Sequence, residues 1–182
     1  VTGVQTCALP ILTNVLKQPD ARDWTSLPPD ASDYTVGLED GIRGLRIAYS
    51  PTLGYANNVH PEIAAAVHAA VQQLQALGAH VEQVDPGFED PLDITTGLWF
   101  LGAYTVWKGL SAEQQAVADP DFQTEAELGA QLSALQIQQL NQRRGVLGSH
   151  MRQFMQRYDL LVTPAVSIPA FEARAAGTVT MN

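Results

Sequence analysis

The sequence predicts an α/β domain with parallel strands, and three observations support this prediction. A strand-like segment at residues 44–49 is followed by an amphipathic helix and then by a second strand-like segment at residues 80–84. This order is typical of the strand–helix–strand unit of a parallel sheet. A short apolar segment at residues 159–163 has the composition of a strand buried on both faces. The stretch between the second and third segments predicts helices.

The first predicted strand has the sequence GLRIAY and covers residues 44–49. Leu45, Ile47 and Tyr49 alternate with smaller or charged residues, which is the two-residue period of a strand. A loop, SPTLGYANN, follows at residues 50–58.

The first predicted helix begins at His60-Pro61-Glu62. Proline at the first helical position loses no hydrogen bond, and a negative charge suits the positive end of a helix. Gly78 stands where a left-handed residue ends a helix, and the strand HVEQV follows at residues 80–84. One apolar face recurs at steps of three and four residues, and its members are Ile63, Val67, Ala70, Val71, Leu74 and Leu77.

Further helices are predicted before the third strand. Residues 92–108 are predicted to form a helix that carries Phe100, Tyr104 and Trp107 as an aromatic stripe along one side. Residues 111–118 are predicted to form a short helix that Ser111 caps. Asp119-Pro120-Asp121 interrupts the chain. Residues 124–157 are predicted to be helical, with interruptions allowed, and their buried side is marked by Leu132, Leu135, Leu140, Leu147, Met151, Phe154 and Tyr158.

The composition describes an acidic globular chain. Of 182 residues, 46% are hydrophobic and only 16% are charged, which argues against intrinsic disorder. Ten basic residues against 19 acidic ones give a net charge of −9, so we expect no nucleic-acid partner and no docking on anionic lipid. No apolar run approaches the ~20 residues that span a membrane. The single cysteine, Cys7, excludes an internal disulfide and a cysteine-based metal site.

The first eleven residues, VTGVQTCALPI, resemble the translation of a common sequencing-library adapter. Non-native segments are set aside before a fold is predicted. We therefore expect residues 1–11 to be adapter-derived and residues 12–182 to be part of a domain; the alternative is a genuine extended N-terminal segment. On the adapter interpretation the natural part lacks cysteine. We expect a cytoplasmic protein, although the periplasm also suits an acidic chain without cysteine.

The residues alone identify no catalytic centre. The histidines at positions 60, 68, 80 and 150 lack the spacing of a helical metal site, so we expect no metal. The sequence contains neither a G-x-S-x-G elbow nor a glycine-rich phosphate loop between strand and helix, and we expect no cofactor.

Two groups of helical residues are candidates for ligand binding. Arg143 and Arg144 could hold a carboxylate by a bidentate fork; the alternative is a solvated helix face. Phe100 and Tyr104, together with Trp107, could line an apolar pocket; the alternative is a core stripe.

Four segments, in order, resemble the amidase signature family of carbon–nitrogen hydrolases. PDARDWTSLP at residues 19–28 resembles the family's segment between the catalytic core and the next strand, and GLRIAYS at residues 44–50 resembles that strand. Residues 60–85, which end in GAHVEQVD, and residues 158–164, YDLLVTP followed by IPAF, complete the series. The resemblance covers residues 12–171. It implies the C-terminal part of the amidase-signature fold, an incomplete mixed β-sheet flanked by helices.

The resemblance also implies an amide hydrolase with a serine nucleophile, a second serine in a cis peptide, and a lysine. A hydroxyl becomes a good nucleophile when a base takes its proton, and backbone N–H groups then stabilise the oxyanion. In the family these residues lie upstream of the segment that PDARDWTSLP resembles. Lys17 and Lys108 stand outside the family's lysine context, and the sequence has no Gly/Ser-rich stretch. We therefore assign no catalytic residue and expect this chain alone to be inactive.

Within that interpretation the chain supplies one wall of a pocket for a small-molecule amide, and Phe100 and Tyr104 are the predicted wall residues. Two other functions stay open. The chain could belong to the A subunit of a tRNA-dependent amidotransferase, which takes ammonia from glutamine and works in a complex. It could also be a self-contained α/β binding module without chemistry, because a fold does not fix a function.

Overall fold

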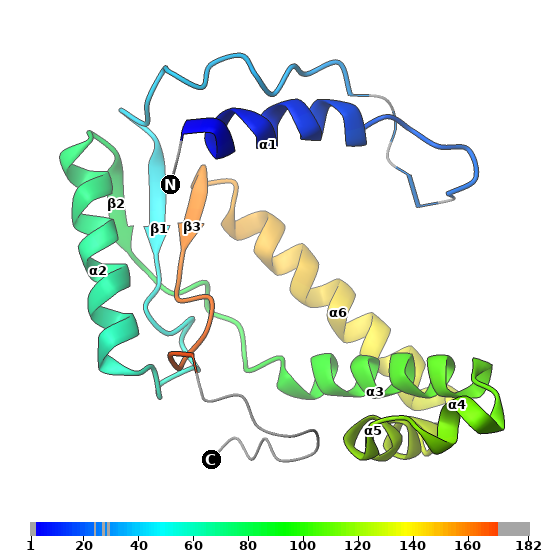
Figure 1. The fold of residues 1–182 in the computed structure, drawn as a ribbon. Coiled ribbons are helices and arrows are strands. Elements are labelled where there is room, and N and C mark those ends of the chain that lie inside the picture. Colours follow the sequence, from blue (N-terminus) through cyan, green and yellow to red (C-terminus); the bar gives the residue numbers. More distant parts are fainter. Residues whose placement is uncertain (1–2, 24, 27, 29, 171–182) are drawn as a thin grey trace. The chain divides into compact units, whose positions relative to one another are not determined.

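A computed structural model describes residues 3–23, 25, 26, 28 and 30–170 (Figure 1). The chain divides into two compact units, Val1–Arg43 and Gly44–Asn182. Helix α1, Gly3–Leu16, belongs to the first unit and contains Pro10. The helix continues from residue 11 to residue 12 without a break. The last residue of the helix is Leu16.

The segment after α1 is built from turns that aspartates hold. Asp20, Asp23, Asp30 and Asp33 each accept a hydrogen bond from the backbone N–H two residues later, at 2.9 Å in every case. These are Asx turns, in which a short carboxylate replaces a backbone partner. Hydrogen bonds from Ser32 hold the pKa of Asp30 at about 2, because they favour the charged form.

The second unit contains a three-stranded sheet with the order β2-β1-β3. Its strands are β1 (Arg46–Tyr49), β2 (His80–Gln83) and β3 (Leu160–Val162). Both pairings are parallel, and Ile47 of β1 is aligned with Val81 of β2 and with Leu160 of β3. Helix α2 connects β1 to β2. The predicted strand–helix–strand unit and the existence of a third strand are confirmed. The expected burial of that strand on both faces is wrong, because β3 has only β1 as a neighbour among the described residues and Leu160 is 47% exposed.

Strand β1 is buried on both faces. The predicted alternation of large apolar residues with smaller or charged ones therefore does not correspond to an alternation of buried and exposed side chains. Ala48 is as fully buried as Ile47. Figure 1 shows the sheet between α2 (Pro61–Ala76) and α6 (Ala134–Phe154). On one face the Tyr49 ring lies 6.4 Å from the His68 ring of α2. On the other face Ala48 packs with Phe154 and with Met151 of α6. A central parallel strand needs no polar face, because helices cover both sides.

The ends of α2 follow the sequence prediction. His60 is the N-cap, Pro61 is the first helical residue, and the His60 Nδ1 atom accepts a hydrogen bond from the Glu62 N–H at 3.3 Å. Gly78 has a φ of 97°, the left-handed conformation that ends a helix without a Cβ clash. The predicted apolar face is too long, however, because Leu77 is 62% exposed.

Four helices separate β2 from β3: α3 (Leu92–Gly109), α4 (Ala112–Ala116), α5 (Pro120–Ala130) and α6. The single helical region predicted over residues 124–157 is therefore two helices. Ser133 begins α6 with a capping box, in which its hydroxyl accepts from the Gln136 N–H. Asp119-Pro120-Asp121 begins α5 rather than only interrupting the chain, because Asp119 is the N-cap and Pro120 the first helical residue. Within the described ranges, no helix has both the length and the apolar character needed to cross a membrane.

A buried serine joins the carboxyl ends of β1 and β2. Ser50 has no exposed surface, and its hydroxyl donates to the Asp85 carboxylate at 2.5 Å. The same oxygen accepts from the Leu53 N–H at 2.8 Å. Leu53 has a φ of 54°, so this hydrogen bond supports a turn in the left-handed region. Both functions of the Ser50 hydroxyl are thus used inside the fold.

Candidate functional site

A cleft of about 470 Å³ lies between α3 and α6. This volume is within the range that binds small molecules. The cleft is lined by residues of both helices and of the turn before α6, namely Asp93, Thr96, Gly97, Phe100, Leu132, Gln136, Gln139, Leu140, Gln142 and Arg143. Two of these lining residues, Phe100 and Arg143, are among the ligand-binding candidates that the sequence predicted.

Gly97 allows α6 to approach α3 closely at one point of the cleft. A Cβ atom added to Gly97 would lie 2.7 Å from Cδ1 of Leu140, closer than real Cβ contacts come. Leu140 therefore packs directly over the backbone of α3. This contact and the half-buried ring of Phe100 form the apolar part of the cleft.

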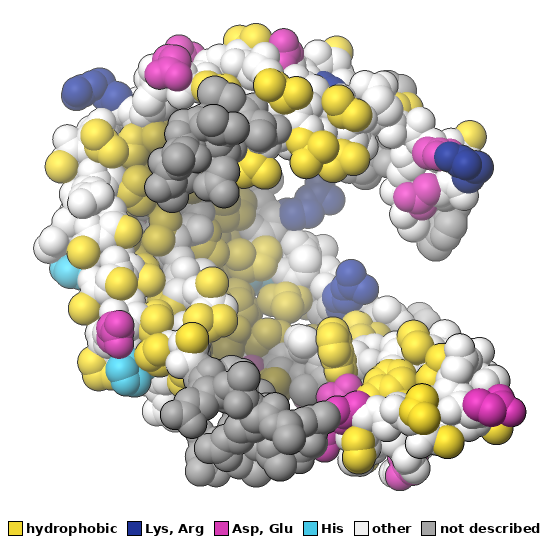
Figure 2. All heavy atoms as spheres, in the orientation of Figure 1, with side chains coloured by type: hydrophobic (Ala, Val, Ile, Leu, Met, Phe, Trp, Pro, Cys, Tyr) yellow, Lys and Arg dark blue, Asp and Glu magenta, His cyan; other side chains and the backbone are white. Residues whose placement is uncertain are grey.

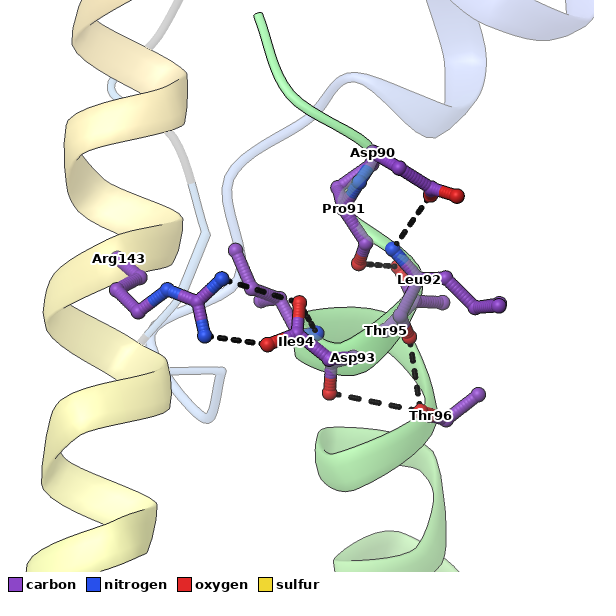
Figure 3. Close-up of polar contacts among 8 residues, drawn as sticks. All are labelled: Asp90, Pro91, Leu92, Asp93, Ile94, Thr95, Thr96 and Arg143. Atoms are coloured by element: carbon purple, nitrogen blue, oxygen red, sulfur yellow. Dashed lines mark hydrogen bonds and ion pairs between the residues drawn. The ribbon is translucent and has the colours of Figure 1, made fainter. Parts of the chain in front are cut away.

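An ion pair between the two helices forms the charged part of the cleft (Figure 3). Both terminal nitrogens of Arg143 donate to the carboxylate of Asp93, and the Nη2–Oδ1 distance is 3.1 Å. The bidentate fork predicted for Arg143 therefore exists, and its carboxylate belongs to the chain itself. The Arg143 guanidinium lowers the pKa of Asp93, because it favours the charged carboxylate. Both side chains are about half exposed.

The first turn of α3 fixes the position of Asp93. Asp90 accepts from the Leu92 N–H at 2.9 Å, and Asp93 Oδ1 accepts from the Ile94 N–H at 2.8 Å (Figure 3). A carboxylate in the first turn of a helix is also favoured by the helix dipole. Arg144, the other predicted fork residue, is exposed and does not line the cleft.

Amide side chains of α6 supply the neutral polar part of the cleft. Gln136 is engaged in the capping box, where its Oε1 accepts from the Ser133 N–H at 2.9 Å. Gln139 and Gln142 make no side-chain hydrogen bond to any residue that the structure describes. A primary amide both donates and accepts, so these two side chains can pair with another amide group. The lining can bind and orient a polar ligand, and it includes no serine or cysteine as a nucleophile.

The structure separates the two predicted wall residues. Phe100 lines the cleft, whereas Tyr104 is not among its lining residues. A Cβ added to Gly129 of α5 would lie 2.0 Å from the Phe100 carbonyl oxygen and 3.0 Å from the Tyr104 Cβ. Tyr104 thus lies where α3 and α5 are in closest contact. The third aromatic residue of the stripe, Trp107, packs against Phe122 of α5. The centres of the two rings lie 5.7 Å apart in an edge-to-face arrangement.

Sequence reasoning missed Asp93 and the glutamines of α6. Asp93 is an ordinary first-turn carboxylate in the sequence, and its pairing depends on how α6 folds back onto α3. The glutamines could be found only by placing residues 134–143 on one helix facing Phe100. For metals, the described part of the chain contains no cluster of three His, Cys, Asp or Glu side chains that could hold an ion.

Comparisons with known proteins agree on one family. The sequence profile of the amidase family matches residues 2–182. The chain is 26% identical over 166 residues to an acylamidase of Rhodococcus erythropolis, a match that covers 90% of this chain and 35% of the relative. It is 38% identical over 74 residues to the A subunit of the glutamyl-tRNA(Gln) amidotransferase of Nitrosococcus oceani, which covers 41% of this chain and 15% of that relative.

The fold agrees with a solved structure of the same kind. A bacterial aryl acylamidase of the amidase signature family superposes with a TM-score of 0.73 at 24% identity, covering 88% of this chain and 34% of that one. The chain thus spans about a third of the length of the relatives that it matches most fully. The profile match begins at residue 2, inside the segment predicted to be adapter-derived, and that origin stays a prediction.

Proposed function

Because the chain belongs to the amidase family, we propose that it is part of an enzyme that hydrolyses an amide C–N bond. The observation that carries this proposal is the family match over residues 2–182. In such a reaction a serine oxygen adds to the amide carbonyl carbon, the amine leaves with a proton, and water then releases the acid. The chain spans about a third of its relatives, so we place the nucleophile and its base in sequence outside it.

The surroundings of the two lysines support placing the catalytic groups outside this chain. Lys17 donates to the carbonyl oxygen of Ser32 and lies 5.1 Å from the centre of the Tyr34 ring. Lys108 is exposed in the last turn of α3. Within the described residues neither amine bonds a serine hydroxyl, the contact that a serine–lysine mechanism needs. On this basis we expect the 182-residue chain alone to be inactive.

We propose that the cleft between α3 and α6 forms one wall of the amide-binding pocket. Phe100 would contact the apolar part of the substrate, and Gln139 and Gln142 would offer donors and acceptors to a polar part. Tyr104 would support this wall through the α3–α5 contact. The substrate class is a small amide with an apolar substituent.

A second candidate function rests on the match to the amidotransferase chain, which has higher identity over a shorter stretch. In that case the amide would be glutamine, and the ammonia released would pass to a partner's substrate. The acylamidase match covers 90% of this chain, whereas the amidotransferase match covers 41% of it. We therefore favour the hydrolase with an apolar amide.

The test uses the full product of the gene that encodes this chain. It is assayed with an anilide, an aliphatic amide and glutamine, before and after treatment with a serine-directed sulfonyl fluoride. We expect hydrolysis of the anilide or the aliphatic amide and its loss on treatment. Glutamine hydrolysis alone would favour the amidotransferase, and no activity on any amide would favour a binding module and contradict the proposal.

The wall assignment has a separate test. Phe100→Leu is expected to raise KM for the active amide on the order of tenfold, because 1.4 kcal/mol of lost contact is a factor of ten. Phe88→Leu, which changes a half-buried aromatic residue outside the cleft and outside the α3–α5 contact, is the matched control and should leave KM unchanged. An equal KM for Phe100→Leu and wild type would exclude Phe100 from the wall.

A further inference from the structure

A second cavity, of about 360 Å³, lies on the side of α3 that faces α5. Trp99 and Val106 of α3 and Phe122 of α5 are among its lining residues, and so is one charged residue, Glu125. Hydrophobic side chains gather at the surface over these helices, with acidic side chains beside them (Figure 2). An apolar cavity with one charged group is the usual pattern of a small-molecule site.

The aromatic side chains of this cavity are held in position by other residues. Trp99 is 65% exposed, yet its Nε1–H donates to Glu125 Oε2 at 2.8 Å, which fixes the indole ring on the surface. The Phe122 ring packs against Trp107 in an edge-to-face arrangement. Gly102 of α3 also lines the cavity, and a Cβ added to it would meet no atom within 4 Å, so there is open space next to α3 at this position. A ligand would meet rings that are already oriented.

Glu125 carries a charge without a cationic partner among the residues that the structure describes. The residue is half-buried as a whole, and its carboxylate accepts a solvent-exposed hydrogen bond from the neutral indole of Trp99. The ion pairs in the described ranges are those of Arg22, Arg46 and Arg143, and none involves Glu125. A carboxylate beside an apolar cavity attracts a cation to that place.

We propose that this cavity binds an organic monocation with apolar substituents, such as a quaternary or protonated alkyl ammonium group. The indole face of Trp99 would attract the cation through its ring quadrupole, for which tryptophan is the strongest side chain. The Glu125 carboxylate would supply the opposite charge, and Phe122 and Val106 would contact the alkyl groups. This site uses no catalytic group and does not depend on the proposed amide hydrolysis.

Another cavity, between β2 and the end of α6, is less suited to a charged ligand. It contains two arginines, Arg46 and Arg157. Arg46 pairs with Asp159, and Glu82 in the same cavity accepts a hydrogen bond from Tyr158 at 2.7 Å. Positive and negative groups are therefore balanced there, whereas Glu125 stands without a counter-charge in the part of the chain that the structure describes.

The test compares a cation with its neutral counterpart. Choline and 3,3-dimethyl-1-butanol have the same shape and differ by the charge on one atom. The full gene product is titrated with each by calorimetry and by saturation-transfer NMR. We expect choline to bind about tenfold more tightly, and to bind more weakly as salt screens the carboxylate. Equal binding of the two compounds, or binding of neither, would overturn the proposal.

Two variants locate the site. Glu125→Gln keeps an oxygen that can accept from the Trp99 indole while removing the charge, and it should reduce the preference for choline to the part that the Trp99 ring supplies. Glu127→Gln makes the same charge change on α5 outside the cavity, where Glu127 accepts from Gln123 at 2.8 Å, and it should leave choline binding unchanged. Trp99→Leu serves as a third variant and should weaken choline binding. Circular dichroism checks the fold of each variant, and an undiminished choline preference in Glu125→Gln would overturn the proposal.

Discussion

At the scale of single residues, the hydroxyl of Ser50 is the contact that joins β1, β2 and the loop between β1 and α2. Ser50→Ala would leave the Asp85 carboxylate and the Leu53 N–H without their partner. A hydrogen bond to a charged group contributes about 1.5–3 kcal/mol, so we expect the free energy of unfolding to fall by about that amount. Ser149→Ala, at an exposed position of α6, is the control and should change it by less than about 0.5 kcal/mol. Denaturant unfolding of the full gene product measures both.

Asp159 makes the stability of the sheet depend on pH. Its carboxylate accepts from the Arg46 guanidinium and from the Arg46 backbone N–H, both at 2.8 Å. These hydrogen bonds lower the pKa of Asp159 to about 2. A lowered folded-state pKa means that the contribution is present above the ordinary pKa of 3.8 and is lost as the pH falls from there through 2.

We therefore expect Asp159→Asn to remove part of the loss of stability between pH 4 and pH 2. The variant should be less stable than wild type at pH 7, and the difference should shrink on acidification. Glu39→Gln, which removes an exposed carboxylate in the first unit, should leave the difference between pH 7 and pH 2 close to that of wild type. Thermal unfolding at a series of pH values gives the comparison, and a pH-independent difference for Asp159→Asn would refute the prediction.

At the scale of elements, two glycines of the helices respond to substitution in opposite directions. Gly145 of α6 is exposed, and a Cβ there would meet no described atom within 4 Å. Gly145→Ala should therefore stabilise the protein by roughly 1 kcal/mol through helix propensity. Gly129→Ala should destabilise it strongly, because the Cβ would collide with the backbone of α3. The midpoint of thermal unfolding should rise for the first variant and fall for the second; a fall for both would mean that α6 is covered at Gly145.

The elements also show what local sequence can and cannot predict. Strands, caps and the parallel unit were predictable, because His60-Pro61-Glu62 and Gly78 act within a few residues of themselves. Interruptions of the helical region 124–157 were expected, but the place of the break before α6 was not predicted, although Ser133 and Gln136 form a local capping box there, because leucines continue on both sides. The cleft required tertiary information. Phe100 was predictable as an apolar stripe residue, whereas the pairing of Asp93 with Arg143 joins positions 50 residues apart.

At the scale of the whole molecule, the sheet has unpaired edges among the described residues. β1 has a neighbour on each side, whereas β2 and β3 each pair only with β1. Leu160 of β3 is 47% exposed, and Val166 and Ile168 after it are 60% and 45% exposed. Parallel strands are normally buried, and exposed edges pair with other chains. The match to the acylamidase covers 35% of that relative's length.

We expect residues 12–182, expressed alone, to self-associate and to bind a hydrophobic dye, because no described segment covers the β3 edge and its apolar side chains. Light scattering after gel filtration and dye fluorescence measure this. Leu160→Lys should reduce self-association more than Leu77→Lys does, since both remove an exposed leucine but only the first places a charge on the strand edge. A monodisperse monomer with one cooperative thermal transition would show that the β3 edge needs no further cover.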